Sequence, residues 1–218
     1  FPYTTLFRSD DQARGRRGRA TELLAYLALH PGASANEIDE ALWPGQRITK
    51  DARNSVMSRA RSWLGTDSDG EPHLALVGEH GDYRLHGVSS DWSDFLDLAR
   101  AGLSADVDEL GVLSALEQAM SLVRARPFLG IDPATYLWAE ADTQEMISTV
   151  VDVAHVLSLT HLSQGNFFAA QEAATRGLLV DPVSELLHCD AIRAAHARGD
   201  DEEALRLSHR LRAQVGLI

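Results

Sequence analysis

A 34-residue interval between small residues near the carboxyl end is the feature that most limits what this chain can fold into. Gly165 and Gly199 stand 34 residues apart, and so do Ala170 and Ala204. Antiparallel helices that cross closely need small side chains where they touch. A stack of helical hairpins repeats this need at a fixed interval along the chain. The interval therefore predicts packed helix pairs, and a plain helical bundle remains the alternative.

The helical pattern covers everything after residue 90. Asn166 and Asp200 follow the two repeat glycines, and each is expected to open a helix. The spacing of small residues that Pro182 closes is similar to the tetratricopeptide pattern. Apolar residues at helical spacing predict helices over residues 91–101, 110–123, 137–162, 166–179, 183–197 and 201–215, with a break at 127–133. We expect residues 89–218 to form a helical, tetratricopeptide-like domain.

Three helix signals follow one another in the first part of the chain. Leucines at helical spacing predict a helix over residues 19–30. Ser34 and Glu37 have the spacing of a capping box, which predicts a second helix. Thr49 is expected to cap a third helix, and Gly65 is expected to end it. Three short helices close together in the chain are typical of a helix-turn-helix domain.

Two short strands are expected after these helices, over residues 73–77 and 83–86. Three helices and a β-hairpin in about seventy residues outline a winged helix-turn-helix. The predicted fold class is therefore mainly α. It consists of a winged helix-turn-helix domain at residues 17–88, followed by the helical domain. Residues 1–16 are interpreted as a tail or linker.

The acidic residues are concentrated in the helical part. The chain has 20 basic and 32 acidic residues, and its net charge of −12 argues against a protein coated in nucleic acid. Residues 1–90 hold 11 basic and 12 acidic residues, whereas residues 91–218 hold 9 and 20. The nearly neutral first part can still contact DNA. The acidic helices favour a protein partner such as a basic peptide.

Two sets of residues carry a resemblance to a known family. The first set is residues 19–32, Ala41-Leu42-Trp43-Pro44, Ser58-Arg59-Ala60-Arg61, Leu64-Gly65 and Tyr83-Arg84-Leu85. The second set is residues 122–128 and Trp138-Ala139-Glu140. Over about residues 17–216 the chain resembles bacterial activators of antibiotic pathways, which join a response-regulator-type winged helix to a bacterial transcriptional activator domain. The resemblance implies a DNA-binding transcriptional regulator whose helical domain binds protein partners.

The chain also departs from that family. Residues 1–16 are too short to supply the small antiparallel sheet that normally precedes the winged helix, and Asp82 stands where the wing usually has glycine. A related group carries the same two domains at the carboxyl end of larger proteins that are membrane-associated or bind peptidoglycan. The alternative function is therefore a protein-interaction module that binds no DNA and forms the cytosolic part of such a protein.

The third expected helix carries most of the candidate DNA contacts. One arc of its helical wheel is expected to be buried, and it holds Ala52, Val56, Met57, Ala60, Trp63 and Leu64. The opposite arc is small and polar, which suits a helix lying in a major groove. With one residue of the wing added, the candidate DNA-binding residues are Lys50, Arg53, Asn54, Ser58, Arg59, Arg61 and Arg84. With so few cations the chain is expected to bind DNA weakly, and a homodimer or a partner would strengthen the binding. The alternative interpretation is an ordinary solvated helix face.

No residue pattern predicts an enzyme, a metal site or a cofactor. His188, Cys189 and Asp190 are adjacent, so their side chains diverge on a helix, and Cys189 is expected to be a buried thiol. The acidic residues 200–203 lack the spacing of an EF-hand and are expected to cap a helix. The single cysteine excludes an internal disulfide and, with no unbroken apolar run long enough to cross a membrane, favours the cytoplasm.

Overall fold

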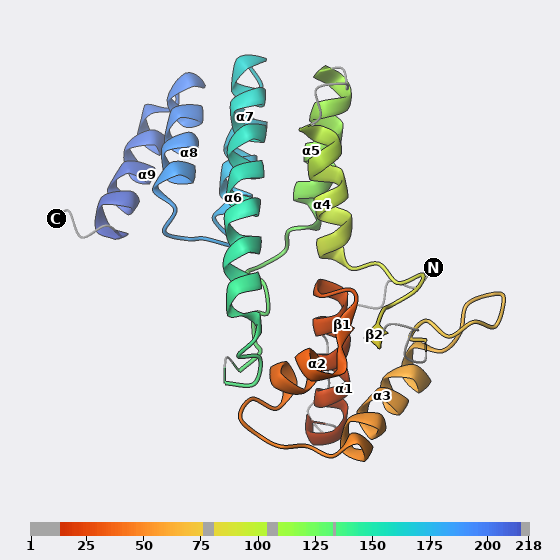
Figure 1. Cartoon of the computed structure of the whole chain (residues 1–218). Helices are drawn as coiled ribbons and strands as arrows, with labels where there is room; N and C mark the ends of the chain where they lie inside the picture. Colours follow the sequence, from red (N-terminus) through yellow and green to blue (C-terminus); the bar gives the residue numbers. More distant parts are fainter. Residues whose placement is uncertain (1–13, 76–80, 104–108, 133, 215–218) are drawn as a thin grey trace. The chain divides into compact units, whose positions relative to one another are not determined.

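The parts of the chain that the computed structural model describes (Figure 1) are residues 14–75, 81–103, 109–132 and 134–214. Within them the chain forms nine helices and two short strands, which confirms the prediction of a mainly helical fold. The chain divides into two compact units: unit 1 is residues 1–90 and 131–142, and unit 2 is residues 91–130 and 143–218.

Unit 1 contains α1 (Arg14–Leu29), β1 (Ala33–Ser34), α2 (Ala35–Leu42), α3 (Lys50–Leu64) and β2 (Asp82–Tyr83). The predicted capping box at the start of α2 is confirmed. Ser34 Oγ accepts a hydrogen bond from the backbone N–H of Glu37, whose carboxylate accepts one from the backbone N–H of Ser34. Thr49 caps α3, and Gly65 ends it at a φ of 72°, both as predicted.

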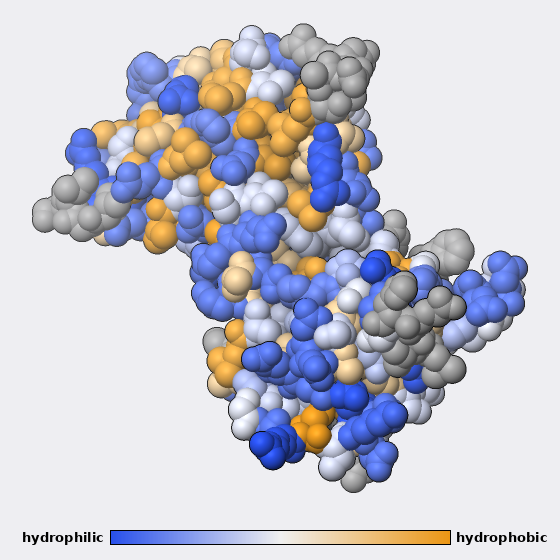
Figure 2. Space-filling model, viewed as in Figure 1, coloured by the Kyte–Doolittle hydropathy of each residue, from blue (hydrophilic) through white to orange (hydrophobic). Residues whose placement is uncertain are grey.

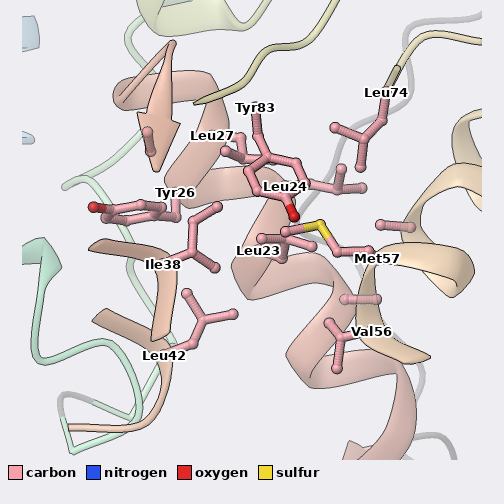
Figure 3. Packing of buried hydrophobic residues seen from close by; sticks show 13 residues of the cluster. Leu23, Leu24, Tyr26, Leu27, Ile38, Leu42, Val56, Met57, Leu74 and Tyr83 are labelled. Atoms are coloured by element: carbon pink, nitrogen blue, oxygen red, sulfur yellow. The ribbon is translucent and has the colours of Figure 1, made fainter. Parts of the chain in front are cut away.

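An apolar cluster holds the three helices of unit 1 together (Figure 3). Leucines of α1 lie at its centre, and side chains of α2, α3 and the segment after α3 surround them. Its most deeply buried members include Leu23, Leu27, Ile38, Leu42, Met57 and Leu74. Burying one such side chain stabilises the fold by about 1.5–3 kcal/mol, so this cluster decides which side of α3 faces solvent.

Two expectations for the helices of unit 1 are wrong. α1 begins at Arg14, inside the expected tail. This start was not predicted, because residues 14–18 are polar or glycine and show no apolar period. Trp63 is 52% exposed and Ala52 is exposed too, although the helical wheel predicts that both are buried. α3 packs mainly on α1, so the covered arc of α3 is narrower than the helical wheel predicts.

The strand pairing in unit 1 differs from the expected hairpin. β1 pairs with β2 in antiparallel fashion, with Ala33 opposite Tyr83. Between the two expected hairpin strands, the described residues show one isolated antiparallel bridge, which joins Leu74 and Leu85. Residues 76–80 of the expected hairpin lie outside the described residues. The two-residue strand β1 is too short to show a period, so its pairing could not be predicted.

Unit 2 and the segment leading into it contain α4 (Asp91–Gly102), α5 (Glu109–Leu122), α6 (Ala139–Ser163), α7 (Phe167–Gly177), α8 (Glu185–Ala197) and α9 (Asp201–Gln214). The helices predicted for this part of the chain are confirmed to within two residues at each end. α6 begins in unit 1, because residues 139–142 belong to that unit, and continues as an unbroken helix in unit 2.

The helix ends of unit 2 repeat at the 34-residue interval. Gly165 and Gly199 both lie in the left-handed region, with φ of 76° and 80°, which glycine adopts without strain. After each glycine, the backbone N–H of the next residue donates to the carbonyl five positions before that residue. The N–H of Asn166 does so at 2.8 Å, and the N–H of Asp200 does so at 3.0 Å. The sequence repeat is therefore a structural repeat of helix ends.

α6 is the one helix of the described residues that is long and apolar enough to cross a membrane, by length and composition alone. Its side chains Val153, Ala154 and Leu157 are buried in the core of unit 2, in the same cluster as Phe95 and Leu116. We interpret α6 as the core helix of unit 2 for this reason.

Candidate functional site

The exposed face of α3 is small and polar. Asn54, Ser58 and Arg59 are exposed there, and Lys50 is exposed at the first residue of the helix. Arg59 Nη2 donates to Ser55 Oγ at 2.9 Å along this face. Four of the seven candidate DNA-binding residues therefore share one accessible surface.

Arg53 lies on the side of α3 that faces α2. Its guanidinium pairs with Asp39, and its side chain is 14% exposed. Arg53 Nε and Asp39 Oδ1 are buried without a hydrogen-bond partner in the described part of the chain. The ion pair joins α2 and α3, so the Arg53 guanidinium already has a partner inside unit 1.

Two further candidate arginines also have partners within unit 1. Arg61 Nε donates to the carbonyl of Leu74 at 2.9 Å, and its Nη2 donates to that of Ala75 at 3.3 Å. These bonds join the last turn of α3 to the segment that follows it. Arg84 Nε donates to the Asp82 carboxylate at 2.8 Å, although the Arg84 side chain stays 58% exposed.

The exposed face of α3 carries little net charge. Lys50 and Arg59 are its exposed cations, and Asp51 is exposed among them in the first turn. A carboxylate there is favoured by the helix dipole but repels a nearby phosphate. Arg47, in the loop before α3, is exposed as well, and it is not among the seven candidates predicted from the sequence. Its position, as a basic residue just before the candidate recognition helix, was the available signal.

A second exposed surface lies along α7 in unit 2. Phe168 is 72% exposed and Leu179 is 51% exposed. Figure 2 shows apolar residues on the visible face of unit 2, in the region where α6 and α7 overlap in the view of Figure 1. The Arg198 guanidinium carbon lies 4.2 Å from the centre of the Phe168 ring. A shallow groove of about 470 Å³ is lined by Phe168, Gln171, Glu172, Thr175, Arg176 and Leu179. An exposed apolar patch with a polar rim suits contact with another protein.

The ionisable side chains near α8 form structural pairs. His155 Nδ1 lies 2.6 Å from the carboxylate of Asp190, to which Arg193 donates at 3.0 Å. Cys189 is exposed, so the prediction of a buried thiol is wrong. His188 and Asp190 point to nearly opposite sides of α8 and are both buried, because α8 packs against α7 and α9, whereas Cys189 between them faces solvent. Among the described residues, no three His, Cys, Asp or Glu side chains are grouped to hold a metal ion.

The helices of the described residues and the repeated helix ends of unit 2 define the class of this protein, a mainly helical one. Residues 90–215 match the model of one family, the bacterial transcriptional activator domain. The match covers more than half of the chain, and the chain belongs to this family, which is a regulatory one. The predicted resemblance is confirmed for the helical part. A comparison with curated proteins found no match.

Proposed function

We propose that this chain is a DNA-binding transcriptional regulator of the cytoplasm, in which unit 1 acts as a winged helix and unit 2 binds a protein partner. The family of residues 90–215 supports the regulatory role. The observation that carries DNA binding is the exposed row of Asn54, Ser58 and Arg59 on α3. This row lies opposite the residues by which the helix packs into the core.

The α3 residues have separate roles in this proposal. Asn54 presents the donor and acceptor pair that suits adenine, and Ser58 is small enough to let the helix approach base edges. Lys50 and Arg59 neutralise phosphates. Arg53 and Arg61 hold α3 in place through bonds inside unit 1. Two phosphate contacts give a salt slope of about −2, so one copy binds weakly and a homodimer binds more tightly.

Fluorescence anisotropy with genomic DNA fragments at low salt tests this function. Arg59→Ala is expected to weaken binding about tenfold and to lower the salt slope by about one. Arg100→Ala is the matched control, because Arg100 is 70% exposed on α4 and its loss changes the net charge equally. Equal binding by the two variants contradicts the assignment of α3, and wild-type binding no stronger than that of a charge-matched control protein contradicts DNA binding.

One observation favours a second function. Arg53, Arg61 and Arg84 are paired within unit 1, which leaves few candidate cations for phosphate. In this second candidate function, unit 1 serves as a scaffold, and the chain is an interaction module in the cytosolic part of a larger membrane-associated protein. The same anisotropy titration separates the two functions, because this module captures a protein partner but binds no DNA.

For unit 2 we propose a basic, partly apolar protein segment that docks over α7. Residues 91–130 and 143–218 together carry 9 basic and 17 acidic residues, which attract a cationic partner. The exposed ring of Phe168 offers the apolar contact. Phe168→Ala is expected to reduce partner capture by affinity purification, whereas Leu205→Ala, which also removes a largely exposed apolar side chain, leaves capture unchanged. Equal capture by both variants contradicts docking over α7.

A further inference from the structure

Residues 131–142 belong to unit 1, although the chain on both sides of them belongs to unit 2. We call this segment the strap. Its last residues, from Ala139 onward, form the first turn of α6. The backbone N–H of Ala139 donates to the carbonyl of Tyr136 at 3.0 Å, so the turn before α6 is itself ordered. One short segment thus takes part in unit 1 and starts the core helix of unit 2.

Trp138 anchors the strap on α1. Its indole Nε1 donates to Glu22 Oε1 at 3.3 Å. Its ring meets the ring of Tyr26 edge-on at 5.1 Å and that of His30 at 6.0 Å between centroids, and it stacks with Tyr136 at 5.5 Å. Glu22, Tyr26 and His30 are spaced four residues apart, so they form one stripe along α1. This stripe has the aromatic surface and the acceptor that an indole requires.

The strap has a second anchor one turn further on. Asp142 Oδ2 lies 3.2 Å from His30 Nε2, and the Asp142 side chain is 18% exposed. Between the two anchors, Ala139 is 3% exposed. The anchors hold both ends of the first turn of α6 against the same stripe of α1.

We propose that the strap is a releasable contact within unit 1: Trp138 and Asp142 hold the first turn of α6 on the α1 stripe, and their release frees that turn from α1. Release of the strap uncovers this stripe of α1, the helix on which α3 packs.

Glu22 is the buried acceptor for the indole of the strap. Its side chain is 1% exposed and accepts from Arg19 Nη1 at 2.6 Å. Burial raises the pKa of Glu22 from 4.5 to about 7, against the opposing effects of Arg19 and of the bond from Trp138. The charge on Glu22 in turn adds to the effect of burial in raising the pKa of Tyr136. The bond from Trp138 by itself favours the ionised carboxylate, and the effect of burial is larger.

Other charged groups around the stripe act on its remaining members. Asp142 from the strap and Glu37 and Glu40 from α2 raise the pKa of Tyr26, after the larger effect of burial. A raised pKa keeps the Tyr26 phenol uncharged at neutral pH, as an aromatic surface for the indole requires.

Hydrogen exchange of the full chain, read by mass spectrometry or NMR, tests the strap. Trp138→Ala is expected to speed exchange of the amides of residues 135–142 at least tenfold. Leu137→Ala is the matched control, because Leu137 lies in the same strap and is 60% exposed. It is expected to leave these rates unchanged. Equal rates in the two variants overturn the proposal.

Glu22→Leu keeps the test decisive where Trp138→Ala unfolds unit 1, because it removes the acceptor of the indole and leaves Trp138 in place. The Glu22→Leu strap is expected to exchange several-fold faster than that of the wild type. Glu22→Gln is the matched control, because its amide oxygen still accepts from the indole, and it is expected to keep the wild-type rate. Equal rates in these two variants overturn the role of Glu22, and neither result depends on DNA binding.

Discussion

The guanidinium of Arg53 on α3 is paired with the carboxylate of Asp39 on α2, at a corner where both side chains are mostly covered. Sequence spacing alone places Arg53 in the first turn of a recognition helix, where it would meet DNA. The ion pair instead makes it part of the joint between two helices. The orientation of the exposed row of α3 therefore depends on a residue that lies outside that row.

Breaking this pair is expected to destabilise unit 1. Asp39→Ala leaves a largely covered guanidinium without its counter-charge, which costs about 1–3 kcal/mol. Urea unfolding followed by circular dichroism measures the loss. Asp69→Ala is the control, because Asp69 is exposed in the loop after α3. An Asp39→Ala protein as stable as the control contradicts a structural role for the pair.

The stability of unit 1 is expected to fall as the pH rises towards neutrality. The pKa of Glu22 is raised in the folded protein from 4.5 to about 7, so the folded state holds a proton that the unfolded state has lost. The resulting stability is full below pH 4.5 and is lost as the pH rises through about 7. Between pH 5 and pH 8 the loss amounts to about 2 kcal/mol. Urea titrations at several pH values measure it, and Glu22→Gln is expected to remove this part of the pH dependence.

Features that depend on neighbours in the chain could be predicted from the sequence. The caps at Ser34 and Thr49 and the end at Gly65 follow from local hydrogen bonding, and the structure has all three. The 34-residue interval predicted helices that open at Asn166 and Asp200, and α7 and α9 begin one residue after them. In each case a side chain or a glycine determines the backbone structure within a few residues of its own position.

Features that join distant residues could not be predicted. Trp138 and Glu22 are 116 positions apart, and no periodicity links them. Arg61 is engaged by the carbonyls of the segment after α3, which a helical wheel does not include. Cys189 was expected inside because free cysteine is usually buried, yet its place on α8 turns it to solvent. The structure therefore exposes Asn54, Ser58 and Arg59 on α3, and it adds contacts of Arg53 and Arg61 that sequence spacing does not reveal.

Enlarging the small residue where α7 meets its neighbours is expected to destabilise unit 2. A Cβ at Gly177 would lie 2.5 Å from Leu187 Cδ1 and 2.7 Å from Ala154 Cβ. Gly177→Ala is therefore expected to cost about 1–3 kcal/mol through overpacking. Gly18→Ala is the control, because a Cβ at Gly18 in α1 would meet nothing within 4 Å, and this change is expected to stabilise by up to about 1 kcal/mol. Thermal unfolding of both variants measures the difference, and a Gly177→Ala protein of unchanged stability contradicts close packing at this contact.

The two repeat units are expected to respond differently to loss of the residue that follows each glycine. Asp200 Oδ1 accepts from the backbone N–H of Glu203 at 3.0 Å, and this bond, with that from Arg198, lowers the pKa of Asp200. Asn166, in the same position of the first unit, makes no capping bond from its side chain to α7. Asp200→Ala is therefore expected to lower the unfolding temperature of unit 2 more than Asn166→Ala does. Because the pKa of Asp200 is lowered, the stabilisation by its cap is present above the ordinary aspartate range and is lost as the pH falls below it. The difference between the two variants is therefore expected to shrink in acid. Calorimetry at neutral and acid pH measures both effects, and equal unfolding temperatures for the two variants at neutral pH contradict the cap.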